Sequence, residues 1–344
     1  MPAALPPALP AHELLRMTSQ AVLPVLQSAV DTLSPELRRA ARFHFGFPGP
    51  DGAPPPGRVS RLRVTALALL CTSIDGGPVE RGLPAAAAFT LTMHQAGIHD
   101  NITDHDAVRY GRPTLWRAFT LDHALQTGTA LLTLAVRMLA VSGYRRRDQM
   151  TTALMDGVVG NSEGQLADLT LDYTTGGPVS PEACLAVAEA KTGPIIRAAC
   201  RVGALAGTAG PEQVDDLAEL GAPIALVMQL RNDLDDLWPP LTGDTTPRRT
   251  DLRHRKVTYP IAAALADTGR ARDRLAAYLA STAEPSPQDL DDLVRAIERC
   301  GGRERTEAAI HQATAQARHR LGRAAPAPQA HADLLALIDL LQRS

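Results

Sequence analysis

Lysine is almost absent from this chain of 344 residues. Of its 35 Lys and Arg residues, only Lys191 and Lys256 are lysines. A general bias toward arginine accounts for this scarcity, and it makes the two exceptions informative. A compact ammonium fits places where the planar guanidinium of arginine does not. We therefore expect a functional role for both lysines.

Cysteine pairing and excess positive charge are also missing, and each absence excludes a class of protein. The net charge of −2 at pH 7 argues against nucleic acid as a partner. The four cysteines show neither CxxC spacing nor a pairing pattern, so we interpret them as small, reduced core residues of a cytoplasmic protein. They are Cys71, Cys184, Cys200 and Cys300.

Apolar runs of the kind that cross a membrane are absent as well. The longest uncharged stretch, from Gly82 to His99, contains threonine, histidine, glutamine and an early proline. It predicts a buried helix and no stable membrane insertion. The segment MPAALPPALPAHELL has no basic region and is interrupted by prolines, which indicates a frayed leader rather than a signal peptide.

A helical pattern runs through the rest of the chain. Apolar residues recur with a spacing near 3.6, as in LLALIDLLQ, and no segment alternates with period two. The pattern predicts an all-α protein of ten or more helices, with residues 1–32 as a poorly ordered leader and first helix and residues 33–344 as one domain. Helix starts are expected at Ser180-Pro181 and Ser286-Pro287, and helix ends at Gly176-Gly177, Pro239-Pro240 and Gly301-Gly302.

The stretch HDNITDHDAVRYGRP gathers carboxylates beside an apolar run. Asp100 and Asp104 are four residues apart and would stack on one helix face. Like charges at this spacing destabilise a helix by roughly a few tenths of a kcal/mol, unless the face is solvated or a hard divalent cation bridges the oxygens. The apolar neighbours favour a cleft and therefore a metal. Asn101 stands where a further carboxylate is expected, and Asp106 is interpreted as solvated.

A second acidic cluster lies in MQLRNDLDDLWPP. Asn232, Asp233 and Asp236 would share one helix face, flanked by Gln229, because their spacings are three and four residues. Asp235 would point elsewhere, into solvent. One acidic cluster is usually a surface feature, but two of similar shape on apolar helices favour a shared metal site.

The two lysines are placed to complete an anion site. Lys191 is followed at once by Gly193-Pro194, and a proline inside a helix bends it and frees backbone carbonyls. An ordinary packing kink is the alternative. Lys256 lies in the basic stretch TDLRHRKVTYP, after the second acidic cluster. Carboxylates, divalent metals and separated cations together form a cage for a highly charged anion such as diphosphate.

From about Leu33 onward, the chain resembles the isoprenyl diphosphate synthases and the class I terpene synthases that share their fold. HDNITDHDAVRYGRPTLW resembles the first aspartate-rich motif, AKTG the lysine–threonine motif, MQLRNDLDDL the second aspartate-rich motif and DLRHRKVTYP the closing motif. Gly164-Gln165 resembles the GQ pair of the family. The resemblance implies the isoprenoid synthase fold, which is a single bundle of helices around a central active-site cavity, and a homodimer.

The resemblance also implies roles for individual residues. Mg²⁺ is the expected cofactor, with three ions, and a prenyl diphosphate is the expected substrate. Where asparagine replaces aspartate, a carbonyl oxygen remains but the charge is lost. The residues implied in catalysis are Asp100, Asp104, Arg109, Lys191 and Lys256. The implied metal ligands are Asp100, Asn101, Asp104, Asn232, Asp233 and Asp236. The implied diphosphate ligands are Arg109, Lys191, Gln229 and Lys256.

Chain-elongating members of the family have a second pocket, for isopentenyl diphosphate, and this chain departs from its motifs. Ser60 stands in place of a lysine, Met93 in place of a histidine or glutamine, and Tyr110 in place of the second arginine of RRG, while Arg63 is retained. Each loss removes a hydrogen bond to a charged group, worth about 1.5–3 kcal/mol. Keeping the ionising site without the condensing site suits a reaction with a single substrate.

Substrate length is suggested by the residues before the first aspartate. Short-chain members tend to place an aromatic residue four or five positions before it. Here these positions hold Gln95 and Ala96, followed by Gly97. A small pocket floor favours a C20 or longer tail, and Phe89 and Thr192 complete the expected lining.

These features predict a cytoplasmic, Mg²⁺-dependent class I terpene synthase. It would ionise a linear prenyl diphosphate, most readily geranylgeranyl diphosphate, and cyclise the carbocation. Two alternatives stay open. One is a trans-prenyl diphosphate synthase that elongates chains with a rebuilt isopentenyl site, and the other is a non-catalytic partner subunit of a prenyl synthase.

Overall fold

The computed structural model describes residues 9–48, 62–170, 179–239 and 249–343. Within these ranges the chain forms fifteen α-helices, which confirms the all-α prediction. A short 3-10 helix (η1, Val79–Gly82) and an antiparallel pair of two-residue strands (β1, Val108–Arg109; β2, Arg112–Pro113) accompany them. The helices are α1 (Ala11–Val30), α2 (Pro35–Phe45), α3 (Arg63–Thr72), α4 (Leu83–Thr103), α5 (Leu115–Ala118), α6 (Leu121–Ala140), α7 (Arg147–Thr170), α8 (Pro181–Ala206), α9 (Pro211–Leu237), α10 (Thr250–Arg253), α11 (Tyr259–Leu265), α12 (Arg270–Leu279), α13 (Pro287–Arg299), α14 (Gly302–Arg323) and α15 (Pro328–Arg343).

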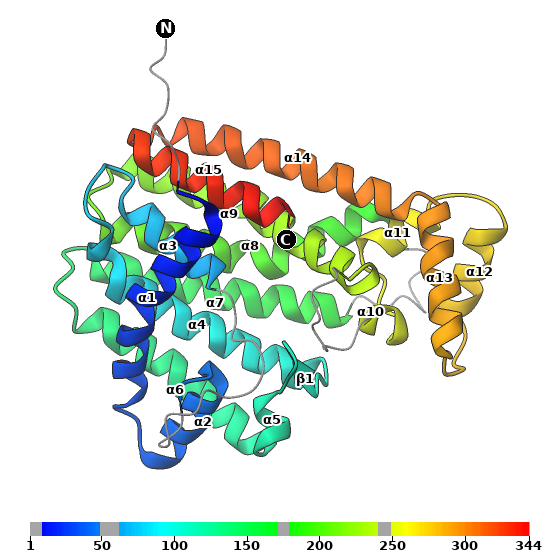
Figure 1. Cartoon of the computed structure of the whole chain (residues 1–344), viewed down its shortest axis with the longest axis horizontal. Coiled ribbons are helices and arrows are strands. Elements are labelled where there is room, and N and C mark those ends of the chain that lie inside the picture. The colour runs from blue at the N-terminus through cyan, green and yellow to red at the C-terminus, as the bar shows by residue number, and fades with distance from the viewer. Residues whose placement is uncertain (1–8, 49–61, 171–178, 240–248, 344) are drawn as a thin grey trace, which may run out of the picture.

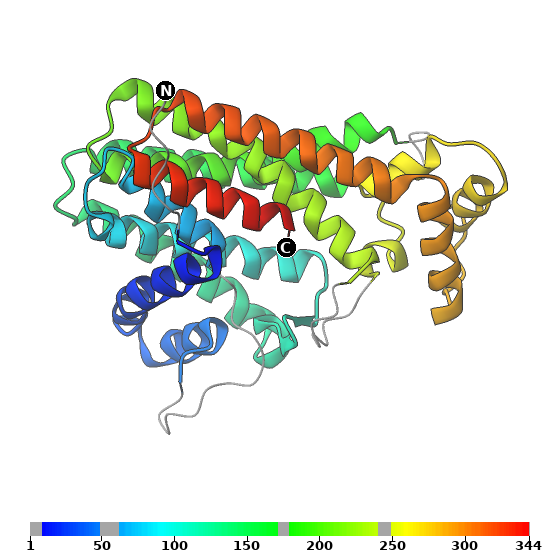
Figure 2. The same ribbon diagram turned by 45° about the horizontal axis from the view of Figure 1, so that its top comes forward.

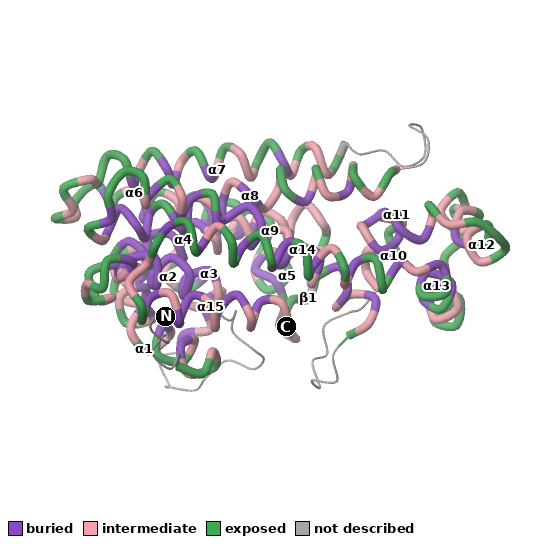
Figure 3. The backbone as a smooth tube through the Cα atoms, turned by 90° about the horizontal axis from the view of Figure 1, so that it is seen from above, coloured by how far each residue is buried: buried purple, intermediate pink, exposed green. Residues whose placement is uncertain are grey.

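The long helices pack around α8. It contacts α7 on one side and α9 on the other, and α4 packs on α6. Helices α14 and α15 lie over the bundle, and α12 and α13 form one end of the molecule (Figures 1 and 2). Figure 3 shows buried stretches concentrated on the central helices, whereas the outer ones expose one side. The acidic segments of α4 and α9 are thereby brought into one bundle.

Local sequence signals set several helix boundaries. The Ser180 hydroxyl accepts a hydrogen bond from the Ala183 amide, and Ser286 forms a capping box with Asp289, so both predicted N-caps are confirmed. Gly301, with φ of 73°, separates α13 from α14, in agreement with the predicted helix end. Gly176-Gly177 lies outside the described residues, as does most of each proline-rich loop.

The first helix belongs to the core. Leu14, Val22 and Leu26 of α1 are buried in the same hydrophobic cluster as residues of α4 and α8. All four cysteines are buried free thiols, as the sequence predicts. In the described part of the chain, no helix is long and apolar enough to span a membrane.

Candidate active site

The first acidic pair lies at the end of α4. The apolar run Ala85–Ala88 is buried and anchors the first half of the helix. Asp100 and Asp104 come in its last turns and are half-buried. Asp104 is the C-cap, and its amide donates to the Asp100 carbonyl at 2.8 Å. The two carboxylates therefore stand where the helix emerges from the core.

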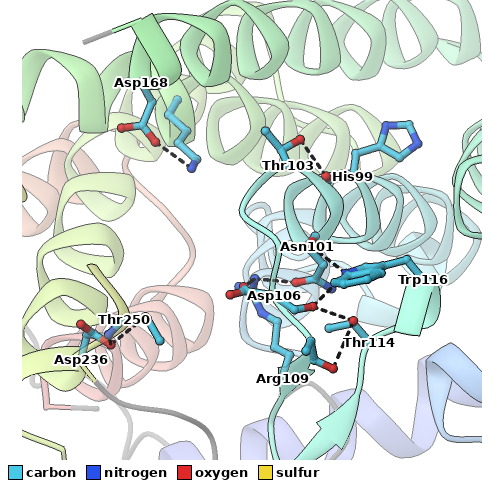
Figure 4. A network of polar contacts seen from close by, with 12 residues as sticks. His99, Asn101, Thr103, Asp106, Arg109, Thr114, Trp116, Asp168, Asp236 and Thr250 are labelled. Atoms are coloured by element: carbon cyan, nitrogen blue, oxygen red, sulfur yellow. Dashed lines mark hydrogen bonds and ion pairs between the residues drawn. The ribbon is translucent and has the colours of Figure 1, made fainter. Parts of the chain in front are cut away.

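Asn101 has a structural task beside this pair. Its side-chain oxygen accepts a hydrogen bond from Arg109 Nη1 at 3.0 Å, and its backbone carbonyl accepts one from Trp116 Nε1 at 3.0 Å (Figure 4). Arg109 also lies 3.7 Å from Asp106 Oδ2. Asp106 is thus half-buried and ion-paired, and the prediction that it is simply solvated is wrong. An amide at position 101 orients Arg109 without adding a further negative charge.

On α9, the second cluster divides between buried and exposed positions. Asp233 is buried, and burial raises its pKa to about 6. Gln229 Nε2 donates to Asp233 Oδ1 at 3.0 Å and its Oε1 accepts from Thr192 of α8 at 3.4 Å. Asn232 is exposed, because consecutive helical residues are about 100° apart and α9 turns Asp233 inward. Asp235 pairs with Arg231 at 3.1 Å.

Asp236 connects α9 to the closing motif. Its carboxylate accepts hydrogen bonds from the Thr250 amide at 3.1 Å, the Thr250 hydroxyl at 3.0 Å and the Asp251 amide at 3.3 Å (Figure 4). Burial, followed by the negative charge of Asp236, raises the pKa of Asp251 to about 8. Asp104 of α4 also contributes to this rise, so charges from both acidic motifs meet here.

Asp168 is the residue that the motif analysis overlooked. Its Oδ2 atom accepts hydrogen bonds from Lys191 Nζ at 3.1 Å and from Lys256 Nζ at 2.7 Å. Burial opposes the charged form, but the two lysine charges prevail and lower the pKa of Asp168. The two lysines of the chain therefore converge on one carboxylate. A signal was available, because Asp168 follows the Gly164-Gln165 pair by one helical turn.

Close packing of α7 on α8 brings Asp168 to Lys191. A Cβ atom at Gly164 would clash with the carbonyl oxygen of Ala190, so glycine permits this approach. Asn161 Nδ2 donates to the Lys191 carbonyl at 2.7 Å. Pro194 lies inside the continuous helix α8, where it cannot donate a backbone hydrogen bond. The amide of Asn161 thus satisfies a carbonyl close to the proline.

The predicted pocket residues occupy different environments. Phe89 is fully buried in the core. Gln95 is buried, and its Nε2 lies 3.0 Å from His99 Nδ1, while its Oε1 has no hydrogen-bond partner among the described residues. Ala96 and Gly97 are half-buried, and a Cβ at Gly97 would meet nothing within 4 Å. Open space therefore lies beside α4 shortly before the first aspartate.

The acidic groups fit divalent cations by their chemistry. Among the described residues, no three His, Cys, Asp or Glu side chains already converge tightly enough to hold a metal ion. Burial raises the pKa values of Asp100, Asp233 and Asp251. The nearby positive charges therefore do not fully offset the cost of burying these carboxylates. Oxygen ligands with surplus negative charge suit Mg²⁺.

Comparison with known proteins supports the same interpretation of the motifs. The family model described as polyprenyl synthetase matches residues 54–297. The chain belongs to this family. A (2E,6E)-farnesyl diphosphate synthase of Mycobacterium tuberculosis is 30% identical over 292 residues, covering 84% of this chain and 80% of the relative. A geranylgeranyl diphosphate synthase of the same species is 29% identical over 289 residues, covering 81% and 79%.

Solved structures of the family share the fold. A polyprenyl synthetase from Streptomyces coelicolor A3(2) superimposes with a TM-score of 0.88 and is 30% identical, covering 96% of this chain and 99% of that one. The predicted isoprenoid synthase fold is confirmed.

The prediction of a terpene cyclase is wrong. The relatives above are named as prenyl diphosphate synthases, and these findings support the alternative of chain elongation. The departures at three motif positions therefore do not exclude chain elongation. Ser60 lies outside the described residues, Met93 packs against the core and Tyr110 is exposed.

Proposed function

We propose that this polyprenyl synthetase is a Mg²⁺-dependent trans-prenyl diphosphate synthase that joins isopentenyl diphosphate to an allylic diphosphate. The observation that carries this proposal is the likeness of the chain to named prenyl diphosphate synthases over most of its length, and the meeting of Lys191 and Lys256 on Asp168 is consistent with it. Two ammonium groups that share one carboxylate form a site where a more highly charged anion competes well. The named activities of the relatives support the same reaction.

The allylic diphosphate would take the place that Asp168 now occupies between the two ammonium groups. Arg109 and Gln229 would donate further hydrogen bonds to its oxygens. Asp100, Asp104, Asp233 and Asp236 would hold Mg²⁺, with three ions proposed, and Asn101 and Asn232 are weaker candidates because one holds Arg109 and the other is exposed. When bound, Mg²⁺ neutralises charge that develops on the departing diphosphate.

The chemistry follows from charge separation. The carbon–oxygen bond of the allylic substrate breaks, and both electrons leave with diphosphate, which the lysines and Arg109 stabilise. The double bond of isopentenyl diphosphate then attacks the allylic carbocation and forms a carbon–carbon bond. Loss of one proton from the adjacent carbon restores a double bond. The product is an allylic diphosphate longer by five carbons.

Product length is proposed to reach C20. Gln95, Ala96 and Gly97 present little bulk, and the space at Gly97 is open. The chain is similar to relatives that are named as farnesyl and as geranylgeranyl diphosphate synthases. The missing aromatic residue favours the longer product. Free buried thiols at all four cysteines support a reducing, cytoplasmic location.

A homodimer is proposed through α6 and α7. These helices follow one another in the chain and pack together. The start of α6 and the second half of α7 carry large exposed apolar side chains, and a homodimer interface would bury them. The residues are Leu121, Leu125, Val159, Leu166 and Leu169.

Product analysis tests the proposed reaction. The purified protein is incubated with Mg²⁺ and C10 or C15 allylic diphosphates, each with and without isopentenyl diphosphate, and extracts are examined by mass spectrometry. We expect longer diphosphates that require isopentenyl diphosphate. Terpene hydrocarbons formed without it, or silence under every condition, would contradict the proposal.

A further inference from the structure

Segment 249–256 carries contacts to both the acidic and the basic groups of the candidate site. Near its start, the amide and hydroxyl of Thr250 and the amide of Asp251 donate to the Asp236 carboxylate. Its last residue is Lys256, one of the two ammonium groups of the site. The Lys256 amide donates to the Asp251 carbonyl at 2.8 Å, which ties the two ends together. A movement of this segment would therefore displace the partners of Asp236 and the ammonium of Lys256 at the same time.

Both ends of the segment adopt a backbone conformation that residues with side chains avoid. Arg249 has a φ of 59° and Arg255 a φ of 58°. The left-handed region costs such residues free energy, and it persists only where surrounding contacts impose it. Contacts from outside the segment must therefore hold its two ends in place.

Helices α12 and α13, at one end of the molecule, supply contacts of this kind (Figure 1). Arg249 forms an ion pair with Asp291 of α13, through Nη1 and Oδ1. The Tyr278 hydroxyl of α12 donates to the Leu252 carbonyl at 3.0 Å. The start and the middle of the segment are thus each joined to one helix of this pair.

The end of the segment is held by the same two helices. Arg255 Nη2 donates to the carbonyl of Ala283, between α12 and α13, and its Cζ lies 5.0 Å from the centroid of the Tyr278 ring. The Leu252 side chain is fully buried in one cluster with Leu275 of α12. Polar and apolar contacts therefore fix the segment along its whole length.

Neighbouring aspartates of α13 show that the contact with the segment is separate from the packing of the helix pair. Asp292 forms ion pairs with Arg274 of α12 at 3.0 Å and with Arg295 of its own helix. Asp291, one position earlier, pairs with Arg249 instead. Loss of the Asp291 carboxylate would loosen the segment and leave the pairing of α12 with α13 intact.

We propose that α12 and α13 form a clamp that positions segment 249–256, with Arg249 and Tyr278 as positioning residues. The part of this inference that concerns substrates rests on the proposed function, in which Asp236 holds Mg²⁺ and Lys256 holds the allylic diphosphate. The clamp acts through these two residues. It restricts the segment to one backbone conformation, so that the carboxylate and the ammonium are presented together.

Amide hydrogen exchange of the metal-free full chain, followed by mass spectrometry, tests the clamp without any substrate. Asp291→Asn and Tyr278→Phe each remove one contact to the segment. We expect peptides that cover segment 249–256 to exchange about twofold to tenfold faster in each variant, as the loss of one ion pair or hydrogen bond implies.

Asp292→Asn and Tyr144→Phe are the matched controls. Asp292 lies on the same helix as Asp291 and is also half-buried. Tyr144 likewise donates its hydroxyl to a backbone carbonyl, that of Arg81. Their hydrogen-bond partners lie outside the segment, so exchange there should keep the wild-type rate. Circular dichroism checks folding, and if Tyr278→Phe does not fold, Asp291→Asn decides the question.

Kinetics measure the consequence for the two substrates. Asp291→Asn and Tyr278→Phe should raise the KM for the allylic diphosphate, and the Mg²⁺ concentration for half-maximal rate, by about twofold to tenfold. The KM for isopentenyl diphosphate should not change, whereas simple loss of folded enzyme would alter none of the three constants. The double variant Arg249→Asp with Asp291→Arg reverses the ion pair and should restore wild-type values, because aspartate tolerates a positive φ.

Failure of the inference differs from failure of the proposed function. A wild type that makes no elongated product refutes the function, and the exchange rates still decide the clamp. Unchanged exchange in folded Asp291→Asn and Tyr278→Phe, or equally fast exchange in the controls, overturns the clamp. Faster exchange with unaltered kinetic constants, in an enzyme that elongates, overturns its positioning role. Faster exchange with a rise in both constants, reversed in the double variant, supports it.

Discussion

Lys191 and Lys256 share one oxygen of Asp168, and this geometry explains why lysine survives there in an arginine-rich chain. A rigid guanidinium spreads its donors over a plane, whereas two compact ammonium groups can approach a single oxygen atom. Burial raises the pKa of Asp100, and the positive charges of both lysines act to lower it. The residues that sequence composition singled out are therefore joined by tertiary structure.

The first prediction concerns Lys256. Lys256→Arg keeps the positive charge, but we expect it to raise the KM for the allylic diphosphate and to lower kcat. The ratio kcat/KM should fall by about tenfold or more, because the planar guanidinium cannot take the position of the ammonium and loses a charge-assisted hydrogen bond. Steady-state kinetics with saturating isopentenyl diphosphate measure this. Arg253→Lys, at an exposed position on α10, is the control. Wild-type kinetics in Lys256→Arg would show that the ammonium is not required.

The second prediction concerns Asp251. Its pKa in the folded protein, about 8, lies above its ordinary value, so the folded state holds a proton that the unfolded chain releases. The corresponding stability is complete below the ordinary pKa of about 4 and is lost as the pH rises through about 8. We expect the melting temperature of the metal-free protein to fall as the pH rises from about 4 to about 8 and to level off above that.

Asp251→Asn should flatten this dependence, because the amide does not ionise. Thermal melts in a chelating buffer measure the effect, and saturating Mg²⁺ should also reduce it in the wild type by supplying positive charge. The exposed Asp148→Asn serves as control. An equal fall in Asp251→Asn and wild type would show that another group is responsible.

At the scale of elements, the contact between α7 and α8 positions the anion site. Gly164 permits the contact, and Asp168 follows one turn later on the same helix. We expect Gly164→Ala to destabilise the fold by about 1–3 kcal/mol, because its Cβ would push against backbone that cannot rotate away. It should also weaken allylic diphosphate binding by shifting Lys191 of α8, which is proposed to hold that diphosphate together with Lys256.

Gly322 of α14 provides the control for this prediction. It is also helical, but a Cβ there would meet nothing within 4 Å. Gly322→Ala should therefore be neutral or stabilise the protein by up to about 1 kcal/mol. Chemical denaturation measures both variants, and equal stability of the two would contradict a close α7–α8 contact.

At the scale of the whole molecule, the exposed apolar face of α6 and α7 sets the expected assembly. We expect the wild type to be a dimer and Leu125→Glu to shift it toward monomer, because a carboxylate cannot be buried unpaired in an apolar interface. Light scattering after size-exclusion chromatography measures the mass. Val141→Glu, exposed at the far end of α6, is the control. A monomeric wild type, or a dimeric Leu125→Glu, would exclude this interface.

Much of the fold could be predicted because its determinants are local. Helical spacing, the caps at Ser180 and Ser286 and the break at Gly301 act within a few residues of themselves, so the sequence alone determined an all-α bundle. The acidic motifs and the two lysines could also be recognised in the sequence, since their residue types are unusual for their surroundings. Their order along the chain identified the family.

Tertiary structure alone decided which groups share a site. Asp168 meets lysines that lie 23 and 88 residues away in the sequence, and Arg249 meets Asp291 across 42 residues. No local pattern records such meetings, because they depend on how closely one helix packs against another. The cyclase prediction rested on three motif positions, whereas the likeness of most of the chain to prenyl diphosphate synthases supports elongation.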